Sequence, residues 1–405
     1  MDRMKPRRSK NRGSALALVL VALILLLVVG GGLLSLGLNG RMLAVRAASE
    51  TGARCAADAG LSKALFDLNE NLKLKNWNDS KLPGATGVAL PNCEATFSYT
   101  VTVDGNSVYS IESLGSCGRA QRSVNSTLRL KTPFEYGIFT QGPILLRSGT
   151  TIDGYNYGAG DNKLKIGTNS TKAGAIMAKT GVTIGGDIVV GVGGDTNVVI
   201  DSMKEATVTG DAYALTESNK LHPINVPKEL VLSPSKGIIS GSTTISSSGK
   251  YDGLKLGNGE IVTVDKPVKL YVPGDLILDN SAQIQVVADA NTGSNGSLTL
   301  YLGGNLVSQN GGFINNLTKN AKRVKVYGLD TCQAITFKTN SIFYGAIYAP
   351  NADVQLHSKV EIFGSVIGES FTQDVNANFH YDASLRQASV SDEVVYFVIE
   401  RWREE

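Results

Sequence analysis

The longest hydrophobic stretch of the chain lies near its start, where residues 13–40 contain no charged side chain. Such a stretch can cross a bilayer as one helix, because about 20 apolar residues span the hydrocarbon core. Beyond it, leucines recur with the spacing of one helical face, at Leu61, Leu65, Leu68 and Leu72. The pattern predicts a transmembrane helix over 14–40 that continues as an amphipathic helix to about Leu74. The glycines at 30–32 predict either a kink or close helix packing.

A different pattern begins near residue 96, where apolar and polar side chains alternate with the period of a strand. The alternation runs from Phe97 to Val103, has a turn composition at 104–106 and returns over 108–114. Turn residues between two such runs indicate an antiparallel hairpin. A third strand is expected around 124–130. We therefore predict a small antiparallel sheet within residues 41–132, preceded by a loop over 77–90.

From residue 133 the chain consists of short Val/Ile/Leu runs separated by Gly and Asn. The segments 343–349 and 362–368 are similar and lie 19 residues apart, and repeats of this kind indicate stacked coils. We predict a β-solenoid, similar to a parallel β-helix, over 133–385, with a long loop or insertion within 206–265. The apolar run 394–399 predicts a strand in the segment 386–405 that caps the open solenoid edge. The fold class is therefore mainly β, after one long helix.

Charge determines how the first helix crosses the membrane. Residues 1–12 contain Arg3, Lys5, Arg7, Arg8, Lys10 and Arg12 against one acid, Asp2. The positive-inside rule places this basic leader in the cytoplasm. The rest of the chain is then exported, as in a single-pass protein of the inner membrane. Beyond the leader, acidic and basic residues nearly balance, so no nucleic-acid partner is predicted.

The cysteines gain importance from this orientation, because exported proteins meet an oxidising environment. Cys93 precedes the first predicted strand and Cys117 follows the second, so the hairpin would bring them together. We predict a disulfide between them, which would stabilise the sheet by about 3 kcal/mol. Two free buried thiols are the alternative. Cys55 and Cys332 have no predicted partner.

The leader ends in Arg12-Gly13, and the apolar run follows with no polar gap. This boundary resembles type IV pilin-like proteins, and residues 8–70 resemble the PilX-type N-terminal domain of minor pilins. The resemblance implies cleavage by a prepilin peptidase between Gly13 and Ser14, and contact with other pilin-like subunits through the helix. Most major pilins have an aromatic first mature residue and a Glu at the fifth, where this chain has Ser14 and Leu18. A plain signal anchor is the alternative; a cleaved signal peptide would have an apolar core of only about 7–15 residues.

A second resemblance covers the end of the repeat region. Residues 343–385, with the sequence APNAD at 349–353, and residues 149–156 are similar to a domain of unassigned function. That domain follows PilX-type N-termini in large predicted pilus proteins. The resemblance implies association with pili and a solenoid, but no established chemistry.

Side chains that could catalyse a reaction are scattered. Polysaccharide-cleaving solenoids need paired carboxylates about 5–9.5 Å apart, and no such cluster is evident in the sequence. With a coil of 19 residues, Glu361 and His380 would stack. Such a pair is a proton-transfer couple, part of a cation site or, more commonly, a hydrogen-bonded corner pair. Asp382 is expected to cap the terminal coil.

The acidic residues also lack the spacing of a calcium-binding repeat, as Asp187, Asp195, Asp201 and Asp211 show. No catalytic residue, metal or cofactor is therefore predicted. We expect a minor pilin-like structural subunit at the tip of a type IV pilus-like filament, with the solenoid as its exposed head. Its Thr- and Asn-rich coils would contact a glycan or a cell surface. A membrane-anchored adhesin that does not polymerise and a polysaccharide-active enzyme are the alternatives.

Overall fold

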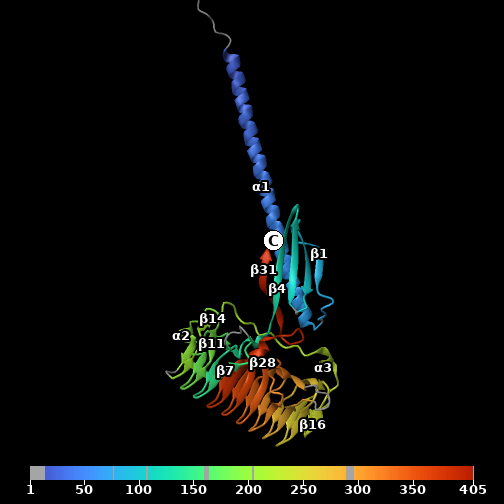
Figure 1. Ribbon diagram of the computed structural model, residues 1–405, viewed down its shortest axis with the longest axis vertical. Helices are drawn as coiled ribbons and strands as arrows, with labels where there is room; N and C mark the ends of the chain where they lie inside the picture. Colours follow the sequence, from blue (N-terminus) through green and yellow to red (C-terminus); the bar gives the residue numbers. More distant parts are fainter. Residues whose placement is uncertain are drawn as a thin grey trace, which may run out of the picture. The chain divides into compact units, whose positions relative to one another are not determined.

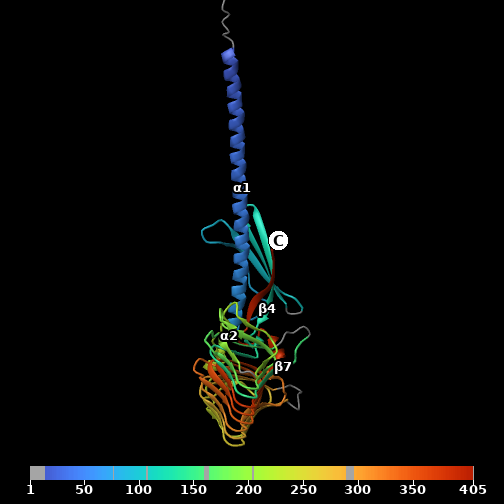
Figure 2. The ribbon, with the colours of Figure 1, turned by 90° about the vertical axis from the view of Figure 1, so that its left-hand side faces the viewer.

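The computed structural model describes residues 14–75, 77–105, 108–158, 164–202, 205–288 and 296–404. The chain forms two compact units, one of residues 1–129 with 397–405 and one of residues 130–396 (Figures 1 and 2). A long apolar helix is followed by mainly β structure, which confirms the predicted fold class. The second unit is inserted in the sequence of the first.

The first unit is built on α1 (Ser14–Lys73), one helix that continues without interruption through the glycines at 30–32. Its N-terminal part is apolar and exposed, as at Leu16, Leu27 and Val45. In the described part of the chain it is the one helix long and apolar enough to cross a membrane. The C-terminal part buries a stripe of small and apolar side chains: Ala53, Ala56, Ala57, Leu61, Ala64, Leu68 and Leu72. The two predicted parts are therefore one continuous helix.

The buried stripe packs on a five-stranded sheet of order β1-β2-β3-β4-β31. Its strands are β1 (Gly84–Ala89), β2 (Thr96–Val103), β3 (Tyr109–Cys117), β4 (Ala120–Lys131) and β31 (Tyr396–Glu404). The strands β2, β3 and β4 are antiparallel neighbours, as predicted. The segment predicted as a loop contains β1, an edge strand whose register shifts between Ala85 and Val88. That irregularity and its Gly-rich sequence weaken the alternation by which a strand is recognised.

The strand β31 corrects the prediction that the C-terminal run caps the solenoid. It borders β4 in the sheet of the first unit. Phe397 is 1% exposed and packs against the rings of Trp77 and Tyr109, at centroid distances of 5.3 and 4.9 Å. The side chain of Asn69 on α1 accepts from the amide of Phe397 and donates to its carbonyl oxygen. Burial of this aromatic side chain in the first unit explains why the strand lies there.

The second unit is the predicted parallel solenoid. Its first block contains η1 (Pro133–Glu135), β5 (Ile138–Thr140), β6 (Ile144–Leu146), β7 (Thr151–Tyr155), β8 (Leu164–Thr168), β9 (Ile176–Ala178), β10 (Thr183–Ile184), β11 (Gly186–Val190), α2 (Thr196–Val199), β12 (Ile200–Ser202), β13 (Thr207–Val208) and β14 (Ala212–Ala214). Strands of successive coils pair in parallel, as β5 with β8 and β8 with β11. Alternate side chains point inward, and Ile138, Ile166 and Ile188 form one buried row.

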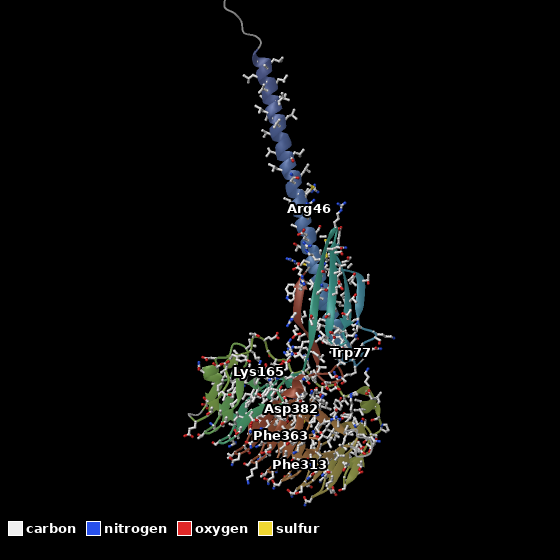
Figure 3. The ribbon with its side chains drawn as sticks, in the orientation of Figure 1. Arg46, Trp77, Lys165, Phe313, Phe363 and Asp382 are labelled. Carbon is white, nitrogen blue, oxygen red and sulfur yellow. The ribbon has the colours of Figure 1, made fainter. Side chains whose placement is uncertain are left out.

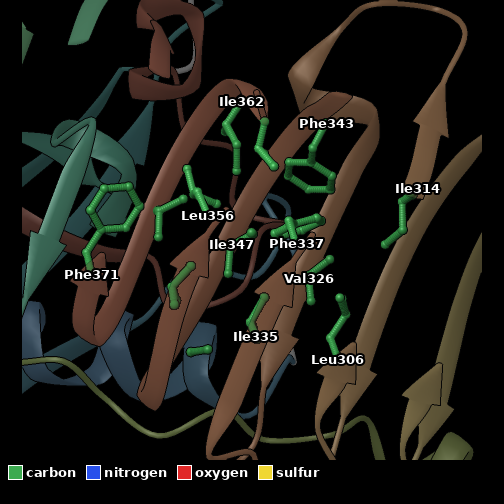
Figure 4. Close-up of a cluster of buried hydrophobic side chains, with 14 of the residues drawn as sticks. Leu306, Ile314, Val326, Ile335, Phe337, Phe343, Ile347, Leu356, Ile362 and Phe371 are labelled. Carbon is green, nitrogen blue, oxygen red and sulfur yellow. The ribbon is translucent and has the colours of Figure 1, made fainter. Parts of the chain in front are cut away.

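The second block begins with α3 (Lys228–Leu232) and continues through shorter and then longer strands. These are β15 (Ile238–Ile239), β16 (Thr243–Ile245), β17 (Gly249–Lys250), β18 (Gly253–Leu256), β19 (Ile261–Val264), β20 (Pro267–Val272), β21 (Leu276–Leu278), β22 (Gln283–Val286), β23 (Ser297–Leu302), β24 (Leu306–Ser308), β25 (Phe313–Asn316), η2 (Ala321–Arg323), β26 (Val324–Gly328), β27 (Ala334–Phe337), β28 (Ile342–Leu356), β29 (Glu361–Gln373), β30 (Asn378–Asp382) and η3 (Ala383–Arg386). The core of these coils contains Leu, Ile, Val and Phe, as Figure 4 shows around Phe337, Phe343 and Ile347.

The coils do not stack in sequence order. On one side, β29 pairs with β28, and on the other it pairs with β5 and β6 of the first block. The strand β30 likewise pairs with β7. The chain therefore enters the solenoid in its middle, winds to one end, crosses to the other end and winds back.

The crossing segment, residues 215–236, covers one face of the solenoid. Leu215, Leu221, Ile224, Val226 and Leu230 pack against a buried row formed by Tyr301, Tyr327 and Tyr348. The hydroxyl of Tyr348 donates to the carbonyl oxygen of His222, at 2.8 Å. The sequence predicted a long insertion over 206–265, and the structure limits it to this segment, because regular strands resume at β15.

Candidate functional site

The most distinctive surface feature of the second unit is a row of stacked rings, defined here as the aromatic ladder Tyr344, Phe363 and His380. The register places these residues side by side on β28, β29 and β30, and Asp153 on β7 continues the row. Because side chains alternate along a strand, all four point away from the buried core. Figure 3 labels Phe363 and Asp382, which belong to this part of the solenoid.

The rings of the aromatic ladder contact one another closely. Tyr344 and Phe363 are stacked with centroids 4.3 Å apart and planes inclined by 8°. Phe363 and His380 follow at 4.5 Å and 23°. Tyr155 meets Phe363 edge to face at 6.0 Å. Stacked cross-strand rings of this kind stabilise neighbouring strands, so the aromatic ladder first of all joins three coils.

The aromatic ladder ends in an acid–base contact. Nδ1 of His380 lies 2.5 Å from Oδ1 of Asp153, and the two side chains are 22% and 50% exposed. Such a contact fixes the orientation of the imidazole ring. It joins β30 to β7, at the point where the last coil of the second block meets the first block.

This geometry corrects the predicted pair of Glu361 and His380. Glu361 aligns with Asn378, whereas His380 aligns with Phe363. The offset from β28 to β29 is 19 residues up to Ala349, 17 from Asp353 onward, and 17 again from β29 to β30. The difference arises at residues 349–353 of β28, where the register shifts. The sequence repeat includes that irregular corner, and the next coil lacks it.

Asp382 has the capping role expected of it. It is 1% exposed and forms the N-cap of η3, accepting from the amide of Ser384 at 3.0 Å. Asn156 donates to the same carboxylate at 3.2 Å and the hydroxyl of Tyr155 at 3.4 Å. Burial raises the pKa of Tyr155, and the neighbouring Asp382 raises it further. The carboxylate thus joins β7 to the end of β30.

A second ionic contact was not predicted from the sequence. Asp374, after β29, lies 2.9 Å from Nε of Arg147 and 3.2 Å from Nδ1 of His357. These residues follow β29, β6 and β28. The strands β28 and β29 are successive coils, whereas β6 neighbours β29 only through the unusual stacking order. No spacing in the sequence reveals that order.

The predicted disulfide is not formed, and all four cysteines are free thiols in the structure. Cys93 lies outside the paired part of β2, which begins with Thr96 opposite Ser116. Cys117 instead faces α1, where a Cβ added at Gly52 would lie 2.8 Å from its sulfur. The helix packing therefore orients this thiol. Of the predicted cleavage site, Gly13 lies outside the described residues and Ser14 begins α1.

Among the described residues, no group of three or more His, Cys, Asp or Glu side chains could hold a metal ion. The aromatic ladder consists of three stacked rings and one acid–base contact, between His380 and Asp153.

Comparisons with known proteins identify one domain. Residues 233–388 match a domain of unknown function (DUF7305). No curated protein matches the sequence. A competence-associated pilin, ComZ from Thermus thermophilus, is 13% identical, with a TM-score of 0.22 over 88% of this chain and 97% of that one.

Two further solved structures are ice-binding proteins. A DUF3494 domain from Shewanella frigidimarina is 14% identical, with a TM-score of 0.30 over 61% of this chain and 94% of that one. An ice-binding protein from an Antarctic bacterium of the Flavobacteriaceae is 12% identical, with a TM-score of 0.23, and covers 61% and 97%.

Proposed function

We propose that this protein is a minor pilin-like subunit that displays a β-solenoid at or near the tip of a type IV pilus-like filament. The observation that carries the proposal is the two-part character of α1. Its first part exposes apolar side chains, and its last part is buried on a small antiparallel sheet. A helix of 60 residues is about 90 Å long, so a membrane-spanning part and a packed part fit in one rod.

The apolar part of α1 supports anchoring in the inner membrane. Residues 13–40 lack charge, and the basic leader favours a cytoplasmic N-terminus. In this proposal a prepilin peptidase cleaves between Gly13 and Ser14. The freed helix then packs against the helices of other subunits, which would cover the apolar side chains when the protein leaves the membrane.

A tip position follows from two features. Leu18 stands where major pilins have a Glu that neutralises a neighbouring N-terminus. The second unit, residues 130–396, is also too bulky for repetition at the close spacing of a fibre. We assign this unit a role in display and adhesion rather than catalysis, with a glycan or a cell surface as its ligand.

Processing tests the anchor. We expect Gly13→Val to leave the leader attached and to keep the chain in the inner membrane, whereas Gly31→Val should be processed normally. A Cβ at Gly31 meets no other atom within 4 Å, so this variant controls for added bulk in the helix. Mass spectrometry of the membrane-extracted chain gives the N-terminus. Retention of Met1 in the unsubstituted chain, despite an active peptidase, would refute cleavage.

Labelling tests the position. Antibody against residues 133–385 should mark the ends of sheared filaments, and deletion of the gene should reduce piliation or adhesion. Uniform labelling along the filament would contradict the tip position. The competing function is that of a membrane-anchored adhesin, which needs the same helix but no filament. Normal filaments without the protein, together with its complete retention in the inner membrane, would support that function instead.

A further inference from the structure

The outer face of the five-stranded sheet carries rows of polar side chains. On β3, Tyr109, Ile111 and Ser113 are buried on the side of α1, so Ser110 and Glu112 point the other way. The register places Ser110 between Thr102 on β2 and Thr127 on β4. One residue pair further along, Glu112 lies opposite Asn125.

These rows form the floor of a groove of about 490 Å³ that residues 401–403 of β31 border on one side. The groove therefore lies entirely within the first unit. Trp402 belongs to its lining and is 62% exposed. The same strand also contains Tyr396 and Phe397, and the ring of Phe397 is buried. The strand thus directs one ring into the core and leaves the indole at the edge of the groove.

We propose that this groove binds a polysaccharide built of pyranose rings with equatorial substituents. Such rings present flat faces of C–H bonds, which complement the face of an indole, while their hydroxyls lie around the rim. An amphipathic ring beside rows of hydroxyl, amide and carboxylate groups provides both kinds of contact. A volume of about 490 Å³ is within the range of ligand sites.

The composition of the groove argues for a sugar over a protein partner. Fully buried centres of protein interfaces are depleted in Ser and Glu and rich in Arg and in several aromatic side chains. Here one indole and the side chains of Arg401 and Arg403 border a groove whose other lining residues are mostly Thr, Ser, Glu and Asn. Hydroxyl and amide groups can each donate and accept hydrogen bonds, as sugar hydroxyls do. The site is independent of the solenoid and of membership in a filament.

Fluorescence of the full chain in detergent micelles tests the proposal. The sequence has two tryptophans, so Trp77→Phe leaves Trp402 as the sole indole. The probes are cellohexaose, chitohexaose and, as a chain with axial linkages, maltohexaose. We expect a saturable change of emission with cellohexaose or chitohexaose and a weaker response to maltohexaose. Calorimetric titration of the chain with both tryptophans provides a second measurement if Trp77→Phe disturbs folding.

Variants locate the site. In the calorimetric titration, Trp402→Ala should raise the half-saturating concentration about tenfold, because the sugar loses its aromatic contact. Thr127→Val should raise it by about 2- to 10-fold, the effect of one hydrogen bond. Thr100→Val is the matched control, because Thr100 is exposed on β2 but does not line the groove, and it should bind like the unsubstituted chain.

Three outcomes would overturn the proposal. They are the lack of saturable binding of any probe, binding that is unchanged in Trp402→Ala by calorimetry, and equal weakening by Thr100→Val. Self-association that Trp402→Ala abolishes, measured by sedimentation without sugar binding, would assign the groove to a protein partner instead.

Discussion

At the scale of residues, small side chains decide how closely α1 approaches the sheet. A Cβ added at Gly115 of β3 would lie 2.0 Å from the carbonyl oxygen of Ala53 and 2.3 Å from the amide nitrogen of Ala57. Both neighbours are backbone atoms, which cannot rotate away. Helix and sheet therefore approach each other at a distance that only glycine allows at this position.

We predict that Gly115→Ala destabilises the first unit by about 1–3 kcal/mol or more, the usual effect of overpacking. Thermal unfolding followed by tryptophan fluorescence measures the change, since Trp77 packs in this unit. Gly105→Ala is the control, because a Cβ at Gly105 meets no atom within 4 Å. Equal unfolding temperatures for the two variants would show that the close approach does not limit stability.

Residue-level predictions from the sequence succeeded where one local pattern decides the outcome. The leucine spacing identified Leu61, Leu68 and Leu72 as buried and Leu65 as partly buried, because a helical face depends only on local periodicity. The pair Glu361 and His380 was wrong because an irregular corner in β28 changes the offset between coils. Asp153, the actual neighbour of His380, is 227 positions away in the sequence.

At the scale of elements, the crossing segment is held by apolar side chains rather than by strand pairing. Leu230 is 5% exposed and belongs to the cluster with the tyrosine row. Leu232, two residues later in the same short helix α3, is 82% exposed. The two leucines form a matched pair, because they share a helix but differ in burial.

We expect Leu230→Ser to increase proteolytic cleavage within residues 215–236 by about 10- to 100-fold. Full burial of a leucine contributes about 1.5–3 kcal/mol, and its loss raises the open fraction accordingly. Limited proteolysis with peptide mapping measures the site and the rate. Leu232→Ser should be cleaved at the original rate; similar cleavage of both variants would mean that Leu230 does not hold the segment.

Elements themselves were predictable, but their partners were less so. Alternation identified β2 and β3, and glycine-separated apolar runs identified the solenoid. The run 394–399 was correctly read as a strand, yet it joins β4 rather than the solenoid. Apolar content indicates that a strand is buried and does not indicate which sheet buries it. The stacking of β29 on β5 could not be predicted either, because the sequence of a buried strand does not show which strand it pairs with.

At the scale of the whole molecule, two covalent connections link the units, one after β4 and one before β31. We predict that Phe397→Ala lowers the stability of the first unit by about 3–5 kcal/mol, because it removes a buried aromatic side chain. Ile399→Ala, at a site that is 37% exposed, should have a smaller effect.

If the two units unfold independently, calorimetry shows a separate unfolding transition for each. The transition that moves in Phe397→Ala should be the one reported by Trp77 fluorescence, because the ring of Trp77 lies 5.3 Å from that of Phe397. The transition of the solenoid should stay in place. A common shift of both transitions would show that the units unfold as one.

The insertion of one unit within the other also sets the order of assembly during synthesis. The strand β31 is translated after all of the second unit, so the sheet beside α1 lacks its last strand until the solenoid has been made. A chain interrupted anywhere in the solenoid would carry a membrane helix and an unfinished sheet with an exposed edge. Completion of this sheet therefore marks chains whose solenoid has been translated in full.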